Sequence, residues 1–480
     1  MRPHSIPGLF AITVLSGVAF GQDAVRLGGP LPITAQPPTA SPNRYIVIFA
    51  AGASQNERAN VVLFAGAQLR HNYSTSEAAA VTVPNANVLD ALRRNPRVSR
   101  VVPDFIVRTS AKGGGRGGNP PPPTPVVFDT RQLISTEVQR VGPPATGSDG
   151  DGIGVAVVDS GIDFNHPDLA PAPNAAATAF NATNPGASCQ DDGGHGTHVS
   201  GMIAALNNAI AIVGVAPAAT LYCVKVLGSD LTGTDSDLVA GLEWVLNNHN
   251  LVNPPIRVVN ASLGRPLDST ETLATSVFRP VIQALYNQGV VVVASAGNDP
   301  TIEISQTVPA GFPEVLAVAS TVAANGVRAC LLAGDPALGA VPADAASDFT
   351  TDGAGVTISA PGEERTDIVP LPFLGCQGLQ YGTLSTTLGT TGATRKLVPS
   401  LVEARGTSFS APLVSGVVAR VLQKLLVPLD SGATTVEGVR SWLKTNASRV
   451  GTAPLDHPWA NVAFPYTFDT VREGIAQAPK

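Results

Sequence analysis

From about residue 128 onward, short apolar runs rich in β-branched residues alternate with longer amphipathic runs. A strand that is apolar at every position must be buried on both faces, and helical runs between such strands are typical of a parallel sheet covered by helices on both sides. The sequence therefore predicts an α/β domain over residues 128–480. Its expected strands are 153–158, 220–227, 256–262, 290–294, 315–319 and 356–358, and its expected helices are 195–206, 236–247, 272–288, 411–426 and 436–446.

A second, smaller pattern precedes this domain at residues 44–108. Three strand patterns alternate with two helical patterns, and there is room for a further strand near 68–73. The strands are expected at 45–50, 78–83 and 98–104, and the helices at 54–69 and 85–94. This β-α-β-α-β order over so few residues predicts a small α+β, ferredoxin-like domain.

Two linkers flank the small domain. Residues 22–43 are polar and rich in proline, and residues 109–127 contain a run of glycines followed by four prolines. Part of the second linker, Gly113-Gly114-Gly115-Arg116-Gly117-Gly118, has a spacing like that of a dinucleotide-binding loop. Such a loop needs a strand before it and a helix after it. Because no strand leads into this run and prolines follow it, we expect a linker.

The first 21 residues have the pattern of a secretory signal peptide. Arg2 precedes an apolar run at 9–15, and Ala19-Phe20-Gly21 supplies small residues where a signal peptidase cuts. The alternative is a membrane anchor, but the apolar run is shorter than the ~18 residues that span a bilayer. We therefore expect a secreted, extracellular protein with no membrane span, in which disulfides are plausible.

Charge is distributed unevenly along the chain, whose net charge is −6. Residues 1–108 hold ten Arg and five acidic residues, a net of +5, which leaves −11 for the remainder. No long basic run is present, and this argues against nucleic-acid binding. A basic leader and an acidic body predict two parts that attract each other.

A candidate nucleophile, Ser408, lies in a turn of small residues directly before an apolar run. Small residues let the backbone bend sharply, and the unpaired N–H groups at a helix start favour negative charge. A serine nucleophile needs such an environment because its attack on a carbonyl creates an oxyanion. The alternative is a serine that only caps a buried helix.

Three further residues lie at the ends of expected elements. Asp159 ends the first strand of the sheet, where functional groups gather in open α/β folds. His195 starts a helix between two glycines, which indicates a close approach of backbone, and Asn298 follows a buried strand. The alternatives are turn roles for Asp159 and Asn298, and a metal pair of His195 with His198. The metalloprotease spacing, with a Glu between histidines four apart, is absent.

Three motifs together resemble the signatures of the subtilisin-like serine proteases, or subtilases. They are Asp159-Ser160-Gly161, His195-Gly196-Thr197-His198 and Gly406-Thr407-Ser408-Phe409-Ser410-Ala411-Pro412. Their order, Asp then His then Ser, is one of the known triad orders. The resemblance covers about residues 129–450, and residues 44–108 are similar to the inhibitor-type propeptide of that family. It implies a subtilisin-like fold for the larger domain.

The resemblance implies a catalytic role for each of these residues. Ser408 would be the nucleophile, His195 the general base, and Asp159 the carboxylate that orients the imidazole. The side chain of Asn298 and the N–H of Ser408 would hold the oxyanion.

Two further segments are similar to the substrate-binding walls of the family. The first, Ser262-Leu263-Gly264, resembles the segment that pairs with the substrate backbone, a mode that tolerates many sequences. The second, Ala294-Ser295-Ala296-Gly297, resembles one wall of the main specificity pocket. Its small apolar residues predict that large apolar side chains are accepted.

Residues 206–217 are similar to the calcium loop of secreted family members. The resemblance implies a structural Ca²⁺ ion with oxygen ligands, which this hard ion prefers. The implied ligands are Leu206, Asn208, Ile210 and Ile212 together with the carboxylate of Asp168. One carboxylate is few for such an ion, so a turn without a ligand is the alternative, and the sequence does not establish a further ligand near Gln132.

Four cysteines, Cys189, Cys223, Cys330 and Cys376, allow three pairings, and the absence of a CxxC motif argues against structural zinc. Residues 330–345 and 364–404 have no counterpart in a minimal subtilase and show little regular pattern, so we expect surface insertions. Because each insertion carries one cysteine, we expect the pair Cys330–Cys376 and hence Cys189–Cys223. Free buried thiols are the alternative.

The sequence thus predicts a secreted serine endopeptidase that acts as a monomer on protein or peptide substrates. Its propeptide would inhibit it within the same chain and be removed within or near residues 106–124. One alternative is an inactive subtilase-like binding protein, which would need a broken triad. Another is a serine esterase, which would need a GxSxG elbow that the turn around Ser408 lacks.

Overall fold

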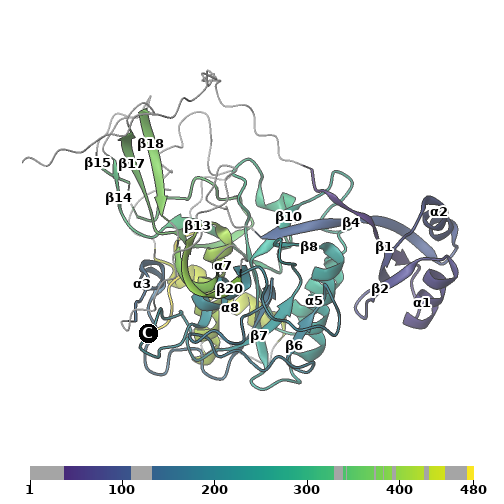
Figure 1. Cartoon of the computed structure of the whole chain (residues 1–480), viewed down its shortest axis with the longest axis horizontal. Coiled ribbons are helices and arrows are strands. Elements are labelled where there is room, and N and C mark those ends of the chain that lie inside the picture. The colour runs from purple at the N-terminus through teal and green to yellow at the C-terminus, as the bar shows by residue number, and fades with distance from the viewer. Residues whose placement is uncertain are drawn as a thin grey trace, which may run out of the picture. The chain divides into compact units, whose positions relative to one another are not determined.

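The computed structural model describes residues 37–109, 132–328, 339–341, 343–371, 375–381, 383–391, 396–425, 432–448 and 473–480 (Figure 1). The predicted signal peptide and most of both predicted linkers lie outside these residues. Within the described part of the chain, no helix is both long and apolar enough to cross a bilayer.

The larger domain is built on a seven-stranded sheet whose neighbouring strands are all parallel. The strand order is β16-β13-β11-β9-β5-β7-β6. The strands are β5 (Gly154–Asp159), β6 (Ala179–Asn181), β7 (Thr220–Lys225), β9 (Ile256–Ala261), β11 (Val291–Ser295), β13 (Leu316–Val322) and β16 (Val356–Glu363). The six predicted strands are confirmed, whereas β6 is too short to show a pattern and was missed.

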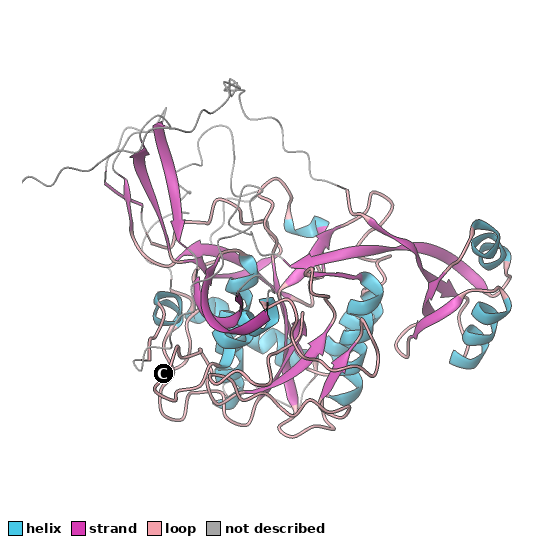
Figure 2. Cartoon of the chain, viewed as in Figure 1, coloured by secondary structure: helices cyan, strands magenta, loops and turns pink. Residues whose placement is uncertain are grey.

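Both faces of this sheet are buried, as the apolar strands predict. In β5, Ala156 and Val158 pack in one hydrophobic layer, while Val155 and Val157 pack in the other. Successive side chains of a strand point to opposite faces, so a strand that is apolar throughout feeds two cores. Helices cover both sides (Figure 2).

One of these layers contains side chains of two helices, and the other contains side chains of four. The first pair is α5 (Asp235–Asn248) and α6 (Arg279–Asn287). The second set is α3 (Thr136–Val141), α4 (His195–Ala204), α7 (Thr407–Gln423) and α8 (Ala433–Asn446).

Two predicted helix starts are wrong. Helix α6 begins at Arg279 rather than at 272, because Thr272 and Thr275 bond to each other's hydroxyl and backbone groups, which holds a turn there. Pro280 then lies in the first turn, where proline is well tolerated. Helix α7 begins at Thr407 rather than at 411, so Ser408 lies on its first turn.

The smaller domain has its own four-stranded antiparallel sheet, in the order β4-β1-β3-β2, and its own hydrophobic core. Strand β2 (Gln68–Asn72) fills the position where the pattern left room. The other elements are β1 (Ala40–Phe49), α1 (Gln55–Phe64), β3 (Ala78–Thr82), α2 (Ala86–Arg94) and β4 (Val98–Thr109). Helix α1 starts at a capping box formed by Ser54 and Glu57, and β4 is five residues longer than predicted.

Strand β4 continues from the smaller domain into the larger one. It pairs there with β8 (Thr232–Thr234) and β10 (Leu263–Pro266), and β10 pairs in turn with β12 (Thr307–Val308) (Figure 1). One antiparallel sheet therefore connects the two domains.

The expectation of little order at 364–404 is wrong. The backbone there forms β17 (Arg365–Leu371), β18 (Gly375–Tyr381), β19 (Thr383–Thr391) and β20 (Lys396–Ala404). The first two pair with each other and extend to β14 (Gly326–Arg328) and β15 (Gly339–Val341), while the last two form a separate hairpin. Residues 364–404 contain seven threonines and three valines, residue types that favour strands although they show no alternation here.

Candidate active site

The candidate triad residues lie at element ends on one side of the parallel sheet. Asp159 is the last residue of β5, His195 is the first residue of α4, and Ser408 is the second residue of α7. All three are buried in this structure. Side chains at the carboxyl ends of parallel strands gather at one edge, which is where open α/β sheets place their functional groups.

Asp159 and His195 form a direct hydrogen-bonded pair. The distance from Nδ1 of His195 to Oδ1 of Asp159 is 2.8 Å, and the N–H of Ser160 donates to the same oxygen at 2.7 Å. Gly196 allows this approach, because a Cβ at that position would collide with the carbonyl oxygen of Gly161. The interpretation that backbone passes close to His195 is therefore confirmed.

Asp191 holds the turn that leads into His195, a role that the sequence analysis missed. One of its oxygens accepts from the hydroxyl of Ser160 at 2.9 Å and from the N–H groups of Gly193 and Gly194 at 2.9 and 2.8 Å. The other accepts from the N–H and the hydroxyl of Thr197 at 2.9 and 2.6 Å. An aspartate that precedes two glycines and a helix is a signal for such a turn.

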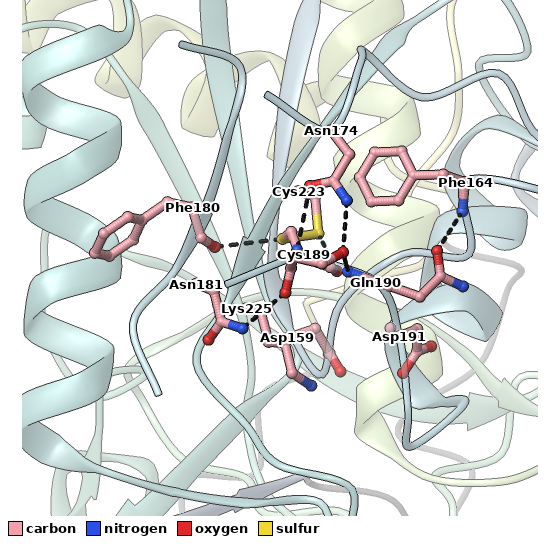
Figure 3. Close-up of a disulfide and its surroundings, with 12 residues drawn as sticks. Asp159, Phe164, Asn174, Phe180, Asn181, Cys189, Gln190, Asp191, Cys223 and Lys225 are labelled. Atoms are coloured by element: carbon pink, nitrogen blue, oxygen red, sulfur yellow. Dashed lines mark hydrogen bonds between the residues drawn. A yellow bond between two sulfur atoms is a disulfide. The ribbon is translucent and has the colours of Figure 1, made fainter. Parts of the chain in front are cut away.

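A disulfide and a buried lysine connect this turn to β7 (Figure 3). Cys189 and Cys223 form a disulfide, and Lys225 lies two residues further along β7. The ammonium group of Lys225 donates to the carbonyl oxygens of Ser160 and Leu227 and to Asp192. The predicted partner pair, Cys330–Cys376, stays a prediction, because Cys330 lies outside the described residues.

Ser408 and Ser262 bond to each other reciprocally. The hydroxyl of Ser408 donates to the carbonyl oxygen of Ser262 at 3.0 Å, and the hydroxyl of Ser262 donates to the carbonyl oxygen of Ser408 at 2.7 Å. Within the described part of the chain, Nε2 of His195 has no hydrogen-bond partner. The ring of His195 lies 5.4 Å from that of Phe409, the residue after Ser408, and no hydrogen bond joins His195 to Ser408 in this state.

Asn298 is fixed close to Ser408. Its Oδ1 accepts from the N–H and from the hydroxyl of Thr407, both at 2.9 Å. These bonds hold the amide against the residue that precedes Ser408. Gly406 supports the same turn with φ of 146°, a region that favours glycine.

Strand β4 lies between β8 and β10, next to these residues. In the register, Thr109 faces Leu263 and Arg108 faces Gly264, while on the other side Val107 faces Gly233. Two of the three residues predicted to bind a substrate backbone, Leu263 and Gly264, therefore pair with an extended segment of the chain itself.

Strand β8 was missed by the sequence analysis, because a three-residue strand around Gly233 carries no periodic signal. The third predicted residue of the first wall, Ser262, precedes this pairing and contacts Ser408. The second predicted wall lies at the end of β11. Its members Ala294, Ser295 and Ala296 are buried, and the role of this wall stays a prediction.

The predicted calcium ligands converge on one point. Nε2 of Gln132 lies 2.5, 3.1 and 3.0 Å from the carbonyl oxygens of Leu206, Ile210 and Ile212, and 3.4 Å from Oδ1 of Asn208. An amide nitrogen has two hydrogens, so four acceptors exceed what it can satisfy. The N–H of Ile212 donates to the carboxylate of Asp168 at 3.3 Å, which places that group beside the others.

The loop of this oxygen cage adopts unusual backbone angles. Ala209 and Ala211 have φ of 69° and 49°, a left-handed conformation that costs energy for a residue with a Cβ. The oxygens offered are carbonyl, amide and carboxylate groups, the set that suits Ca²⁺. The residues present therefore fit the ion, and Gln132 joins them although the sequence did not establish it.

The alternative of a metal pair at His195 and His198 finds no support. Within the described residues, no three His, Cys, Asp or Glu side chains are placed to hold a metal ion together. Burial, and to a lesser degree the nearby His195, lowers the pKa of His198 to about 3. His198 packs with its ring 4.5 Å from that of Phe409, so it is a neutral core residue close to the turn that carries Ser408.

The smaller domain also contacts helix α5 through charged groups. Asp237 accepts hydrogen bonds from Arg44 at 3.0 and 3.1 Å and from Arg70 at 3.0 Å. Burial disfavours the charged form of Asp237, but the bond to His71 and the two arginines together lower its pKa. The uneven charge of the chain thus appears as specific ion pairs.

Two further carboxylates, one from each domain, accept hydrogen bonds across this contact. Asp104 of β4 accepts from the N–H and the hydroxyl of Ser236 at 2.9 and 2.7 Å, at the start of α5. Glu243 of α5 accepts from the N–H groups of Ser74 and Thr75 at 2.9 and 2.6 Å. Each domain therefore satisfies backbone donors of the other.

Comparison with known proteins places this architecture among the serine hydrolases. The Subtilase family (Peptidase S8) matches residues 150–461, which is more than half of the chain. The chain belongs to this family, and it is a subtilisin-type serine endopeptidase.

Individual relatives agree with this assignment. Subtilisin E from Bacillus subtilis (strain 168) is 29% identical over 424 residues, which cover 87% of each chain. M-protease from Shouchella clausii (strain KSM-K16) is 32% identical over 391 residues, 81% of this chain and 78% of the relative.

A solved structure is similar in fold. It is that of fervidolysin from Fervidobacterium pennivorans, described as a keratinolytic enzyme related to subtilisin. The alignment has a TM-score of 0.59 at 19% identity, over 93% of this chain and 63% of the fervidolysin chain. The chain thus spans less than two thirds of that protein's length, and the likeness shows the fold.

Proposed function

We propose that the chain is a secreted endopeptidase that hydrolyses peptide bonds with Ser408, His195 and Asp159. The observation that carries the proposal is the Asp159–His195 pair at 2.8 Å beside Ser408, next to two strands that already hold an extended segment. Substrates would bind as that segment does, by adding a strand between β8 and β10.

In the proposed reaction, the hydroxyl of Ser408 turns from the carbonyl of Ser262 toward Nε2 of His195. Its oxygen attacks the substrate carbonyl while His195 takes the proton, and Asp159 holds Nδ1–H and stabilises the imidazolium. The amide of Asn298 and the N–H of Ser408 donate to the oxyanion.

The second half of the reaction releases both products. His195 returns the proton to the leaving amine, and an acyl-enzyme remains on Ser408. A water molecule, deprotonated by His195, then attacks the ester carbon. The tetrahedral intermediate formed in this way then breaks down. Its breakdown frees the carboxylic acid, and His195 returns the proton to Ser408.

The smaller domain would act as an inhibitory propeptide, removed to release the mature enzyme. Its strand β4 occupies the substrate strand position, and Leu263 faces Thr109. Ser110 follows Thr109 in the sequence and Ser262 precedes Leu263, and the carbonyl of Ser262 accepts from Ser408. We therefore assign the bond between Ser110 and Ala111 as the one cleaved, within the predicted range of 106–124.

Two further parts of the proposal concern the environment of the enzyme. The cage around Gln132 would hold a structural Ca²⁺ ion, which would neutralise the clustered oxygens and keep their loop in its strained conformation. The signal-like residues 1–21 support export, and we propose that the mature enzyme acts outside the cell as a monomer.

Casein hydrolysis by the purified full chain and by its Ser408→Ala variant tests this function. The proposal expects the parent to cleave casein and the variant to lose at least about 10³-fold in rate. A short-chain ester assayed in parallel separates the alternatives. Hydrolysis of the ester without casein would indicate an esterase, and inactivity on both would indicate a binding protein.

A further inference from the structure

An aromatic side chain of β4 stacks on an arginine of the larger domain. The guanidinium carbon of Arg265 lies 4.8 Å from the ring centre of Phe105. Arg265 belongs to β10 and follows Gly264, which pairs with β4 itself. A cation over the face of an aromatic ring is attracted by the ring's negative face.

Arg265 is a rigid platform rather than a surface cation. Its side chain is only 3% exposed. Its Nε and one terminal nitrogen donate to both oxygens of Asp235 at 2.7 and 2.6 Å. The terminal nitrogens also donate to Glu271 at 2.7 and 3.2 Å, and one donates to the carbonyl of Pro266 at 2.9 Å. These bonds occupy the edge of the planar group, so its face is what it offers to a partner.

All the groups that hold Arg265 belong to the larger domain. Asp235 starts α5, and Glu271 and Phe278 follow β10, with the Phe278 ring centre 5.9 Å from the guanidinium carbon. The platform therefore remains in place after the smaller domain leaves. Its partner ring, that of Phe105, is removed with β4.

The register defines which substrate residue would reach this platform. Val107 faces Gly233 and is fully buried against the larger domain. Phe105 lies two residues before it, and residues two apart in a strand point to the same side. When Ser110 is counted as the first residue before the cleaved bond, Phe105 is the sixth.

We propose that Arg265, clamped by Asp235 and Glu271, forms a subsite that selects an aromatic side chain at the sixth substrate residue before the cleaved bond. This inference rests on the proposed function and extends the binding cleft beyond the backbone pairing with β8 and β10. A cavity of about 50 Å³ lies beside Phe105 and Arg265.

The test compares peptide anilides hydrolysed by the mature enzyme. The parent substrate is Phe-Ile-Val-Arg-Thr-Ser-p-nitroanilide, after the chain's own sequence, with its first residue varied to Trp, cyclohexylalanine, Ala or Lys. We expect kcat/KM for Phe and Trp to exceed that for Ala roughly three- to tenfold, the range of a partly desolvated cation–π contact. Cyclohexylalanine is apolar but has no π face, so we expect its kcat/KM to fall between those for Phe and Ala. The kcat/KM for Lys should lie below that for Ala.

A double variant assigns the preference to the platform. Arg265→Met with Asp235→Asn removes the cation without leaving Asp235, the more buried of its two carboxylate partners, unpaired. We expect the Phe-to-Ala ratio to fall to about one, a readout that cancels any general loss of rate. The matched control is Arg279→Met with Glu314→Gln, an arginine clamped by a carboxylate over Phe312, and it should keep the ratio.

The outcomes separate this inference from the proposed function. A Phe-to-Ala ratio near one in the parent enzyme overturns the subsite, and so does a ratio kept in the double variant. If that variant does not mature, the order of Phe, cyclohexylalanine and Lys in the parent enzyme decides. Failure of the parent to hydrolyse even the tetrapeptide Val-Arg-Thr-Ser-p-nitroanilide would overturn the proposed function instead.

Discussion

At the scale of single residues, Asp191 carries much of the geometry around His195. It accepts five hydrogen bonds, among them those from the backbone of Gly193, Gly194 and Thr197, and none of the five comes from Ser408 or from β4. It is a positioning residue, since it fixes the start of the helix that carries His195. Ser160 links it directly to the strand end at Asp159.

Asp191→Asn should lower kcat more than it changes KM. An amide would direct two hydrogens toward groups that are themselves donors, so the turn would shift, and a displacement of about 1 Å at a catalytic group can cost about 10²-fold in rate. The measurement is kcat and KM on a peptide anilide, with the pH profile of kcat as a second readout.

The neighbouring Asp192→Asn variant provides a matched control, because its carboxylate is half-exposed and bonds only to Lys225 among the described residues. We expect it to change kcat less than about threefold. Equal losses in both variants, or a loss confined to KM for Asp191→Asn, would contradict a positioning role.

A second residue-scale prediction concerns His198, whose pKa is lowered to about 3 from 6.5, mainly by burial. The unfolded chain then binds a proton more readily than the folded chain. The contribution of His198 to stability is complete above pH 6.5 and is lost as the pH falls toward 3, by at most about 5 kcal/mol.

His198→Gln, made in the Ser408→Ala background, should make the free energy of unfolding less dependent on pH between 6.5 and 4. The change in slope corresponds to about one proton, which the unfolded parent chain binds and the folded parent chain does not. Urea unfolding at several pH values measures this slope. An unchanged slope would show that His198 is protonated in the folded state as easily as in the unfolded state.

At the scale of elements, patterns of burial were predictable and local hydrogen bonding was not. The six strands follow from continuous apolar runs such as 291–295, because a parallel sheet covered on both faces imposes that pattern. The early start predicted for α6 failed, because Thr272 and Thr275 hold a turn that apolar periodicity cannot show. Strand β8, at Thr232–Thr234, has β4 as its pairing partner among the described strands, and this long-range pairing leaves no pattern in its three residues.

The residues of the site likewise fall into those that the sequence showed and those that it did not. Asp159, His195, Asn298 and Ser408 stand beside the ends of expected elements, a position visible in the sequence, and the motif order then implied their roles. Asp191 was missed, because its role depends on five hydrogen bonds from four residues, which only the folded chain brings together. The platform at Arg265 likewise joins segments that are far apart in sequence.

The loop between α4 and β7 gives an element-scale prediction. If it binds Ca²⁺, the ion should stabilise the folded chain by about 3 kcal/mol at a concentration 100-fold above its Kd. Thermal unfolding of the Ser408→Ala chain with calcium and with a chelator measures this effect, without any assay of activity.

Asn208→Ala should remove most of this calcium response, because the side-chain oxygen of Asn208 faces the cage. Asn207→Ala is the matched control, an exposed neighbour of the same type, and it should respond as the parent does. A midpoint that is the same with calcium and with chelator in the parent chain would contradict the site.

At the scale of the whole molecule, the two domains are joined by a strand and by charge. The net charges of +5 and −11 predicted that the two parts attract each other, but not which residues form the ion pairs. In the structure, arginines of the smaller domain pair with Asp237 at the start of α5. Asp237 is nearly fully buried between Arg44, Arg70 and His71, so its charge is screened little by salt.

Asp237→Asn should therefore speed the release of the cleaved smaller domain. Loss of a buried, hydrogen-bonded charge acts mainly on dissociation and costs about 2 kcal/mol or more, so the lag before full activity should shorten about tenfold or more. Asp151→Asn changes the net charge equally at an exposed site and should leave the lag as it is. Equal lags in all three proteins would contradict the role of Asp237.

The central claim is that Ser408 is the nucleophile of an endopeptidase, and labelling with a fluorophosphonate tests it most directly. In this reaction the Oγ of an activated serine forms a bond to phosphorus as fluoride leaves, and peptide mass analysis locates the adduct. The account predicts one adduct, on Ser408, that forms in step with the loss of casein hydrolysis. Full labelling at another residue, or continued hydrolysis after Ser408 is modified, would contradict it.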